Sequence, residues 1–88
     1  MNIDFTAILK GINDDYNKKK ALTTINIDKN NYDYAYLELE QKIYDFSYKD
    51  NTAEITLPVN LLINKEFELI LVSEKEAKQQ KIKIGEKQ

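Results

Sequence analysis

The chain has 88 residues, a formal net charge of −2 and 42% hydrophobic residues, which is typical of one globular domain covering residues 1–88. It has no cysteine and no histidine, so disulfides, thiolate nucleophiles, zinc–thiolate sites and histidine general bases are excluded. All 13 basic residues are lysine, and the absence of arginine argues against bidentate reading of guanine in DNA.

Charge is distributed unevenly along the chain. Residues 28–76 carry five lysines and eleven acids, whereas residues 77–88 carry four lysines and one acid. The middle of the chain is therefore acidic and would attract a basic partner. The richness in Lys, Asn and Ile, without Arg, Trp, His or Cys, is typical of AT-rich genes and fits a low-GC bacterium, phage or plasmid.

The first twenty residues fit two patterns. Phe5, Ile8 and Ile12 fall on one helical face that Asp4 could cap, which predicts a helix at about 4–18. Residues 3–9 also alternate as a strand does, and Gly11 weakens a helix. We favour a strand over 3–9 followed by a polar loop over 10–19. The start, MNIDFTAILK, has no basic n-region, and no apolar run approaches about 18 residues, so a cytoplasmic location is expected.

The rest of the chain alternates between apolar and polar residues with a period of two, which indicates half-buried strands. Turn residues separate the segments, for example at 28–31, 49–51 and 63–66. Pro58 cannot donate to a ladder, so its strand ends there or lies at an edge. The predicted strands cover residues 21–28, 34–41, 42–49, 52–59, 66–73 and 79–86.

Their spacing predicts a mostly β fold, either an antiparallel sandwich or a small barrel, with an immunoglobulin-like sandwich favoured. The alternative is an α+β fold with the N-terminal helix at about 4–18. The apolar phase of the strands predicts a core that includes Leu37, Ile55, Leu57, Phe67, Leu69 and Leu71.

Residues 52–86 resemble the last three strands of immunoglobulin-like and fibronectin-III-like modules. In those families a leucine and a short turn lead to an aromatic residue that opens a strand, and a polar hairpin and a final strand follow. Leu62 and Phe67 occupy the corresponding places, although Phe67 replaces a tyrosine. The resemblance implies a β-sandwich that binds or spaces and has no shared catalytic site.

Motifs for catalysis and metal binding are incomplete. Ser47 and Ser73 have no histidine to activate them, so no enzymatic activity is predicted. DKNNYDYAYLEL starts like a calcium loop, but Asp33 stands in place of the glycine and Leu39 in place of the bidentate glutamate. We therefore expect no metal and no cofactor.

The stretch NYDYAYLELE puts Tyr32, Tyr34, Tyr36, Glu38 and Glu40 on one side of a strand. Ala35, Leu37 and Leu39 lie on the other side and are expected to face the core. The tyrosines could serve only to stabilise cross-strand pairs, for instance with Tyr44 and Tyr48, or the register could be reversed. As a surface, the five residues predict a partner-binding face, because tyrosine is enriched in interfaces and carboxylates select a Lys/Arg-rich partner.

The sequence thus predicts a non-enzymatic protein-binding module. It would serve either as an accessory of a phage or surface assembly or as a small inhibitor of a host or phage factor. The alternative is a small β-barrel that binds single-stranded nucleic acid, since such proteins stack bases on aromatic side chains beside lysines.

Overall fold

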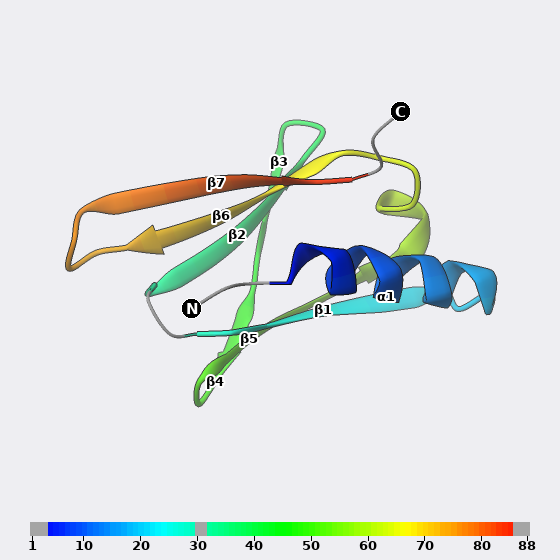
Figure 1. Ribbon diagram of the computed structural model, residues 1–88, viewed down its shortest axis with the longest axis horizontal. Helices are drawn as coiled ribbons and strands as arrows, with labels where there is room; N and C mark the ends of the chain where they lie inside the picture. Colours follow the sequence, from blue (N-terminus) through cyan, green and yellow to red (C-terminus); the bar gives the residue numbers. More distant parts are fainter. Residues whose placement is uncertain (1–3, 30–31, 86–88) are drawn as a thin grey trace.

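The computed structural model describes residues 4–29 and 32–85 and consists of one N-terminal helix followed by strands in two antiparallel sheets (Figure 1). The predicted mostly β character is confirmed. The elements are α1 (Phe5–Asn17), β1 (Leu22–Asp28), β2 (Tyr34–Leu39), β3 (Lys42–Asp45), β4 (Ser47–Lys49), β5 (Thr52–Pro58), the 3-10 turn η1 (Val59–Leu61), β6 (Phe67–Ser73) and β7 (Lys78–Ile84).

The N-terminal segment is a helix, so the favoured strand over 3–9 and polar loop over 10–19 are wrong and the alternative helix at about 4–18 is correct. Asp4 caps the helix, because its Oδ1 accepts a hydrogen bond of 3.0 Å from the backbone N–H of Ala7. Ile12 is fully buried, and Phe5 and Ile8 pack against the core from the same face. Capping and this apolar stripe outweigh the weakening effect of Gly11.

The strands form two sheets with the orders β1-β5-β4 and β3-β2-β6-β7. Every pairing is antiparallel. One apolar cluster contains side chains from both sheets, such as Ile55 and Leu69, so the sheets share a single core. Helix α1 runs beside β1, and the Thr23 hydroxyl donates a hydrogen bond of 2.6 Å to the Asp15 carboxylate (Figure 1).

The predicted strand over 42–49 is two strands in different sheets. β3 pairs with β2, and β4 pairs with β5. The chain crosses between the sheets at Phe46, whose side chain is buried in the core with 3% exposure. The sequence keeps Tyr44, Phe46 and Tyr48 in one phase through this crossing, so the apolar and polar alternation does not reveal it.

All six residues predicted for the core are buried: Leu37, Ile55, Leu57, Phe67, Leu69 and Leu71. The predicted turns also hold, since Asp50 and Asn64 adopt φ angles of 55° and 59° between strands. Of the predicted turn at 28–31, residues 30–31 lie outside the described residues. Strand β5 ends at Pro58, as the missing N–H requires. The helix found in residues 4–29 and 32–85 is too short to cross a membrane.

The core predicts the effect of truncating its central residue. Leu69 is 0% exposed and lies between β2 and β7 in the larger sheet. Leu69→Ala should lower the free energy of unfolding by about 2–5 kcal/mol, because it removes buried methyl groups and leaves a cavity. Urea denaturation followed by circular dichroism measures this loss, and an unchanged midpoint would contradict the assigned core.

Candidate interaction surface

Strand β2 carries three of the five predicted site residues on its outer face. Ala35, Leu37 and Leu39 face the core, as the alternation predicts. Tyr34 and Tyr36 therefore project outward with Glu38; Tyr34 is 40% exposed, and the other two are half-buried.

Tyr32 does not share this face, so its expected outward position is wrong. It precedes β2 and is buried with 8% exposure. Its hydroxyl donates a hydrogen bond of 2.7 Å to the backbone oxygen of Asp28. Desolvation, with a smaller effect from the neighbouring Tyr48 and Asp28, raises the pKa of Tyr32 to about 12. The two-residue period fails here because strand geometry begins only at Tyr34.

Glu40 lies in the turn between β2 and β3 rather than in the strand. The strand ends at Leu39, and Glu40 has a φ of 50°. Its carboxylate forms an exposed ion pair with the Lys65 ammonium at 3.5 Å. Glu40 is therefore at the opposite end of β2 from Tyr34.

The exposed tyrosines of β2 meet a third ring from the other sheet. The ring centroids of Tyr34 and Tyr36 are 6.5 Å apart in a stacked arrangement, and those of Tyr34 and Tyr48 are 6.4 Å apart, edge to face. We call Tyr34, Tyr36 and Tyr48 the tyrosine cluster. The Lys29 ammonium lies 5.3 Å from the Tyr48 ring centroid, within the range of a cation–π contact.

The Tyr48 hydroxyl joins the two sheets. It accepts a hydrogen bond of 2.8 Å from the backbone N–H of Ala35 and donates one of 3.0 Å to the backbone oxygen of the same residue. The backbone N–H and C=O of Ala35 point to the edge of β2 that pairs with β3. The chain leaves this edge at Phe46, and the Phe46 N–H donates a hydrogen bond of 3.4 Å to the Ala35 oxygen. The hydroxyl thus replaces a missing ladder partner for a residue that is 0% exposed.

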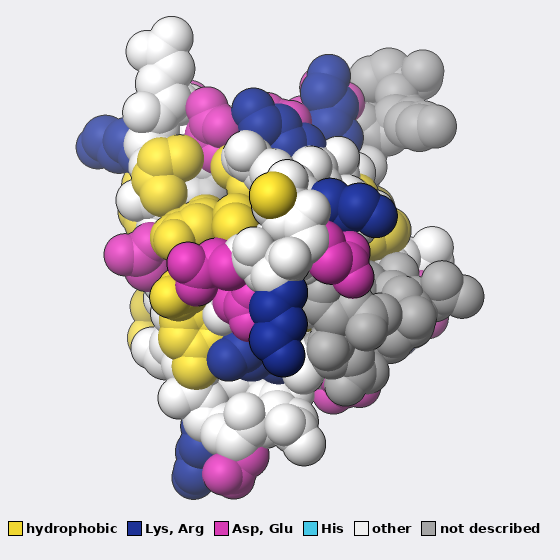
Figure 2. Space-filling model, turned by 90° about the vertical axis from the view of Figure 1, so that its left-hand side faces the viewer, with side chains coloured by type: hydrophobic (Ala, Val, Ile, Leu, Met, Phe, Trp, Pro, Cys, Tyr) yellow, Lys and Arg dark blue, Asp and Glu magenta, His cyan; other side chains and the backbone are white. Residues whose placement is uncertain are grey.

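Carboxylates flank the tyrosine cluster near the β6–β7 hairpin. The Asp33 carboxylate accepts a hydrogen bond of 2.7 Å from the backbone N–H of Glu74. A hydrogen bond with the Glu74 carboxylate, and then its negative charge, raise the pKa of Tyr34. Viewed from this end of the molecule, hydrophobic and acidic side chains lie next to one another (Figure 2).

Further along the same sheet face, Glu38 is paired in register with Glu68. Like charges directly opposite each other destabilise a sheet, and Lys83, opposite Glu68 on β7, offsets part of this repulsion. The two glutamates line a shallow pocket of about 220 Å³ together with Glu40, Glu66 and Lys83. Among the described residues, Lys83 on β7 is the one lysine that lines this pocket, and it lies opposite Glu68.

Sequence reasoning missed part of this surface. Asp33 and Glu74 are far apart in the chain and meet only because β2 pairs with β6. Tyr48 shares the phase of Tyr44 and Phe46, which was a usable signal, but its contact with Tyr34 depends on the crossing between sheets. Within residues 4–29 and 32–85, no group of three or more acidic side chains is arranged to hold a metal ion.

Comparisons with protein-family models, curated proteins and solved structures found no match. The resemblance of residues 52–86 to immunoglobulin-like modules therefore stays a prediction. The function has to be argued from the geometry of this surface.

The double role of the Tyr48 hydroxyl predicts a specific loss of stability. Tyr48→Phe leaves the buried N–H and C=O of Ala35 without this partner, so the free energy of unfolding should fall by about 1–3 kcal/mol. Tyr34→Phe is the matched control, because its hydroxyl contacts an exposed carboxylate, and it should change stability by less than about 0.5 kcal/mol. Equal effects in urea denaturation would contradict the assigned role.

Burial of Tyr32 predicts a loss of stability at alkaline pH. Its folded pKa of about 12 lies above the usual value of 10.0, so the stabilisation by its neutral form is complete below pH 10.0 and is lost as the pH rises towards about 12. Tyr32→Phe should be less stable at neutral pH but should show a shallower decline of stability across this window. Denaturation at a series of pH values measures how the free energy of unfolding depends on pH in both proteins. The same dependence in the wild type and in Tyr32→Phe would contradict the buried position of Tyr32.

Proposed function

We propose that this protein is a non-enzymatic protein-binding module that binds a Lys/Arg-rich partner through the tyrosine cluster and its flanking carboxylates. The observation that carries the proposal is the contact of Tyr34 with Tyr36, Tyr48 and Glu74 on one exposed face. Aromatic rings supply large contact areas at low entropic cost, and a surrounding rim of charge selects and steers the partner.

The cluster is held in place before any partner binds. Tyr48 is fixed by its two hydrogen bonds to Ala35, and Tyr34 rests against it. Ile70 is paired with Tyr36 in the sheet and lies on the same outer face, but only 5% of it is exposed. It therefore provides an apolar contact beneath the tyrosine side chains. A preorganised surface loses less entropy on binding, which favours a recognition role.

A second candidate function, binding of single-stranded nucleic acid, is favoured by one feature. In the pairing of β6 with β7, Lys81 lies opposite Ile70 and Lys83 opposite Glu68, so two lysines share the sheet face with Tyr36. Lysines beside exposed aromatic rings suit backbone contacts and base stacking. We favour a protein partner, because Glu74 contacts Tyr34 and the paired Glu38 and Glu68 follow Tyr36 along the same sheet face, and these carboxylates repel phosphate.

We further infer an immunoglobulin-like sandwich that lacks its first strand. In such domains strands B, E and D form one sheet, and C′, C, F and G form the other. The orders β1-β5-β4 and β3-β2-β6-β7 follow this arrangement, with α1 preceding β1 in place of strand A. Phe67 opens β6 at the position of strand F. Proteins built this way commonly bind or space other proteins, which supports the proposed function by analogy.

Two settings fit such a module: an accessory of a phage or surface assembly, and a small inhibitor of a host or phage factor. The neighbouring genes separate them. Tail or baseplate genes beside this one would favour the accessory, and a cluster of small early genes would favour the inhibitor.

The experiment is an NMR titration at low salt with a short Lys/Arg-rich peptide and, separately, with oligothymidine. We expect the basic peptide to shift the amide signals of Tyr34, Tyr36 and Glu38. The double variant Tyr34→Ser/Tyr36→Ser should bind at least about tenfold more weakly, the cost of losing roughly 1.4 kcal/mol of contact. Tyr16→Ser is the matched control, because Tyr16 is 45% exposed on α1, away from this face.

Charge reversal separates the two classes of partner. Glu38→Lys should weaken binding of the basic peptide, most strongly at low salt, because it removes an attractive charge at the rim. If the partner is a single-stranded nucleic acid, the same variant should bind oligothymidine more tightly. Signals of Tyr34 and Tyr36 that move no more than that of Tyr16 would contradict the proposed site.

A further inference from the structure

Strand β1 has one edge without a strand partner among residues 4–29 and 32–85, where it pairs with β5 alone. The hydrogen bonds from Lys29 N to Asn51 O and from Val59 N to Ala21 O bracket this ladder and show that odd-numbered residues of β1 bond to β5. The backbone groups of Leu22, Thr24 and Asn26 therefore point to the other edge.

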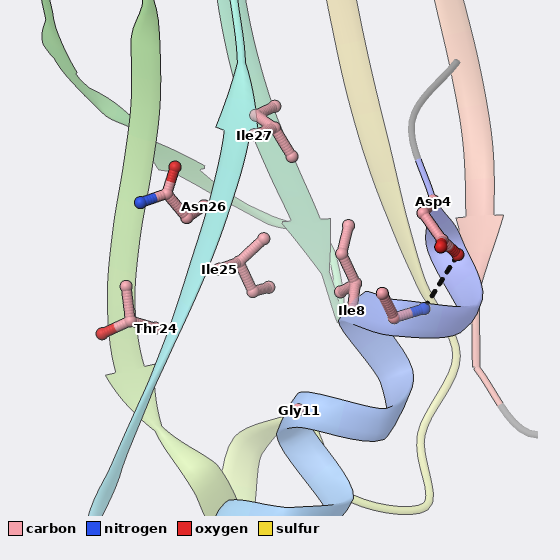
Figure 3. A pocket seen from close by; sticks show the side chains of 8 residues that line it. Asp4, Ile8, Gly11, Thr24, Ile25, Asn26 and Ile27 are labelled. Carbon is pink, nitrogen blue, oxygen red and sulfur yellow. Dashed lines mark hydrogen bonds between the residues drawn. The ribbon is translucent and has the colours of Figure 1, made fainter.

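A pocket of about 250 Å³ lies between this edge and α1 (Figure 3). The helix contributes Asp4, Ala7, Ile8 and Gly11, and the strand contributes residues 24–27. Ile8 and Ile25 supply apolar walls on either side, and Thr24 and Asn26 lie along the strand (Figure 3).

Gly11 keeps the helical side of the pocket open. A Cβ atom built at Gly11 would meet nothing within 4 Å, so no close contact inside the domain requires glycine at this position. Glycine in the interior of a helix is unfavourable relative to alanine. The free edge of β1 and the open space beside Gly11 thus line the same pocket.

We propose that an extended segment of a partner protein adds to β1 in this pocket as an antiparallel strand. The segment would bond to the backbone of Thr24 and Asn26, and small or β-branched side chains at alternate positions would fit beside Ala7 and Gly11. Edge addition of this kind gains affinity from main-chain hydrogen bonds and specificity from alternate side chains. The site is separate from the tyrosine cluster and does not depend on the function proposed for that cluster.

Charge fixes the chemistry of the occupant. Asp4 lines the pocket where α1 begins, and exposed Asp28 ends β1. At the other end of the strand, exposed Lys18 and Lys19 lie in the link between α1 and β1, where the Asp15 carboxylate is already paired with Lys20. All strand pairs among residues 4–29 and 32–85 are antiparallel. An antiparallel segment complements these charges when it is basic at its amino end and acidic at its carboxyl end. At about 3.3 Å per residue, a segment of about seven residues matches the length of β1.

The test uses two synthetic peptides of identical composition, Ac-KKTVTVTEE-NH2 and the charge-reversed Ac-EETVTVTKK-NH2. We expect the first to bind the full chain at least about tenfold more tightly than the second in fluorescence titrations, and to slow hydrogen exchange of the Thr24 and Asn26 amides. Equal affinities, or protection that excludes these two amides, would overturn the proposal.

Two variants locate the binding. Thr24→Pro removes an N–H that points away from β5 and should abolish binding, whereas Thr24→Ser keeps that N–H and should bind like the wild type. Gly11→Leu fills the open space, so it should abolish binding while leaving the denaturation midpoint equal or higher. The Tyr34→Ser/Tyr36→Ser variant should bind the peptide normally, which separates this site from the tyrosine cluster.

Retained binding by Gly11→Leu would overturn the proposal, because the space beside Gly11 would then not be the binding site. A dimer of the free chain in analytical ultracentrifugation that Thr24→Pro dissociates would also overturn it. That result would assign the β1 edge to a second copy of this chain instead.

Discussion

The fold depends on how the chain passes from one sheet to the other at Phe46. Because the chain leaves the β2 edge there, the backbone N–H of the fully buried Ala35 has no ladder partner, and its C=O keeps only a hydrogen bond of 3.4 Å from the Phe46 N–H. An unpaired buried backbone group is costly, and the Tyr48 hydroxyl satisfies both groups at once. Because Tyr48 belongs to β4 and Ala35 to β2, the same hydroxyl fastens the two sheets at the point where the chain connects them.

This structural role shapes the candidate site. The Tyr48 ring remains 39% exposed although its hydroxyl is committed to the backbone, so the ring serves as a fixed support for Tyr34. The carboxylates of Asp33 and Glu74 border the same rings because β2 and β6 are neighbours. A partner of the proposed site would therefore meet an aromatic surface whose geometry is set by packing within the domain, with the Asp33 and Glu74 carboxylates beside it.

The sequence predicted what local periodicity determines. Strands such as residues 52–59 and 66–73 bury one phase, so Ile55, Leu57 and Leu69 were identified as core from alternation alone. Residues 3–9 fit two periods at once, and only the cap at Asp4 and the packing of Ile12 decided for a helix. Tertiary context outweighed the pattern there.

The candidate site was predicted in part for the same reason. The outward positions of Tyr34, Tyr36 and Glu38 were predicted from the alternation of β2. Tyr32 and Glu40 lie beyond the ends of this strand, where the alternation of side chains no longer applies. Tyr48, Asp33 and Glu74 join the surface through contacts between segments distant in sequence. Alternation cannot encode such contacts, because the crossing at Phe46 keeps the same period on both sides.

Amide hydrogen exchange at Ala35, followed by NMR, tests the central claim most directly. Ala35 and Leu37 are both fully buried, but only Leu37 lies within the paired stretch of β2 and β3, whereas Ala35 relies on a side-chain hydroxyl. If the Tyr48 hydroxyl closes this edge, the Ala35 amide should be protected to within about tenfold of the Leu37 amide in the wild type. In Tyr48→Phe, Ala35 should lose far more of its protection than Leu37. An Ala35 amide that exchanges in the wild type as fast as those of exposed turns would contradict the account.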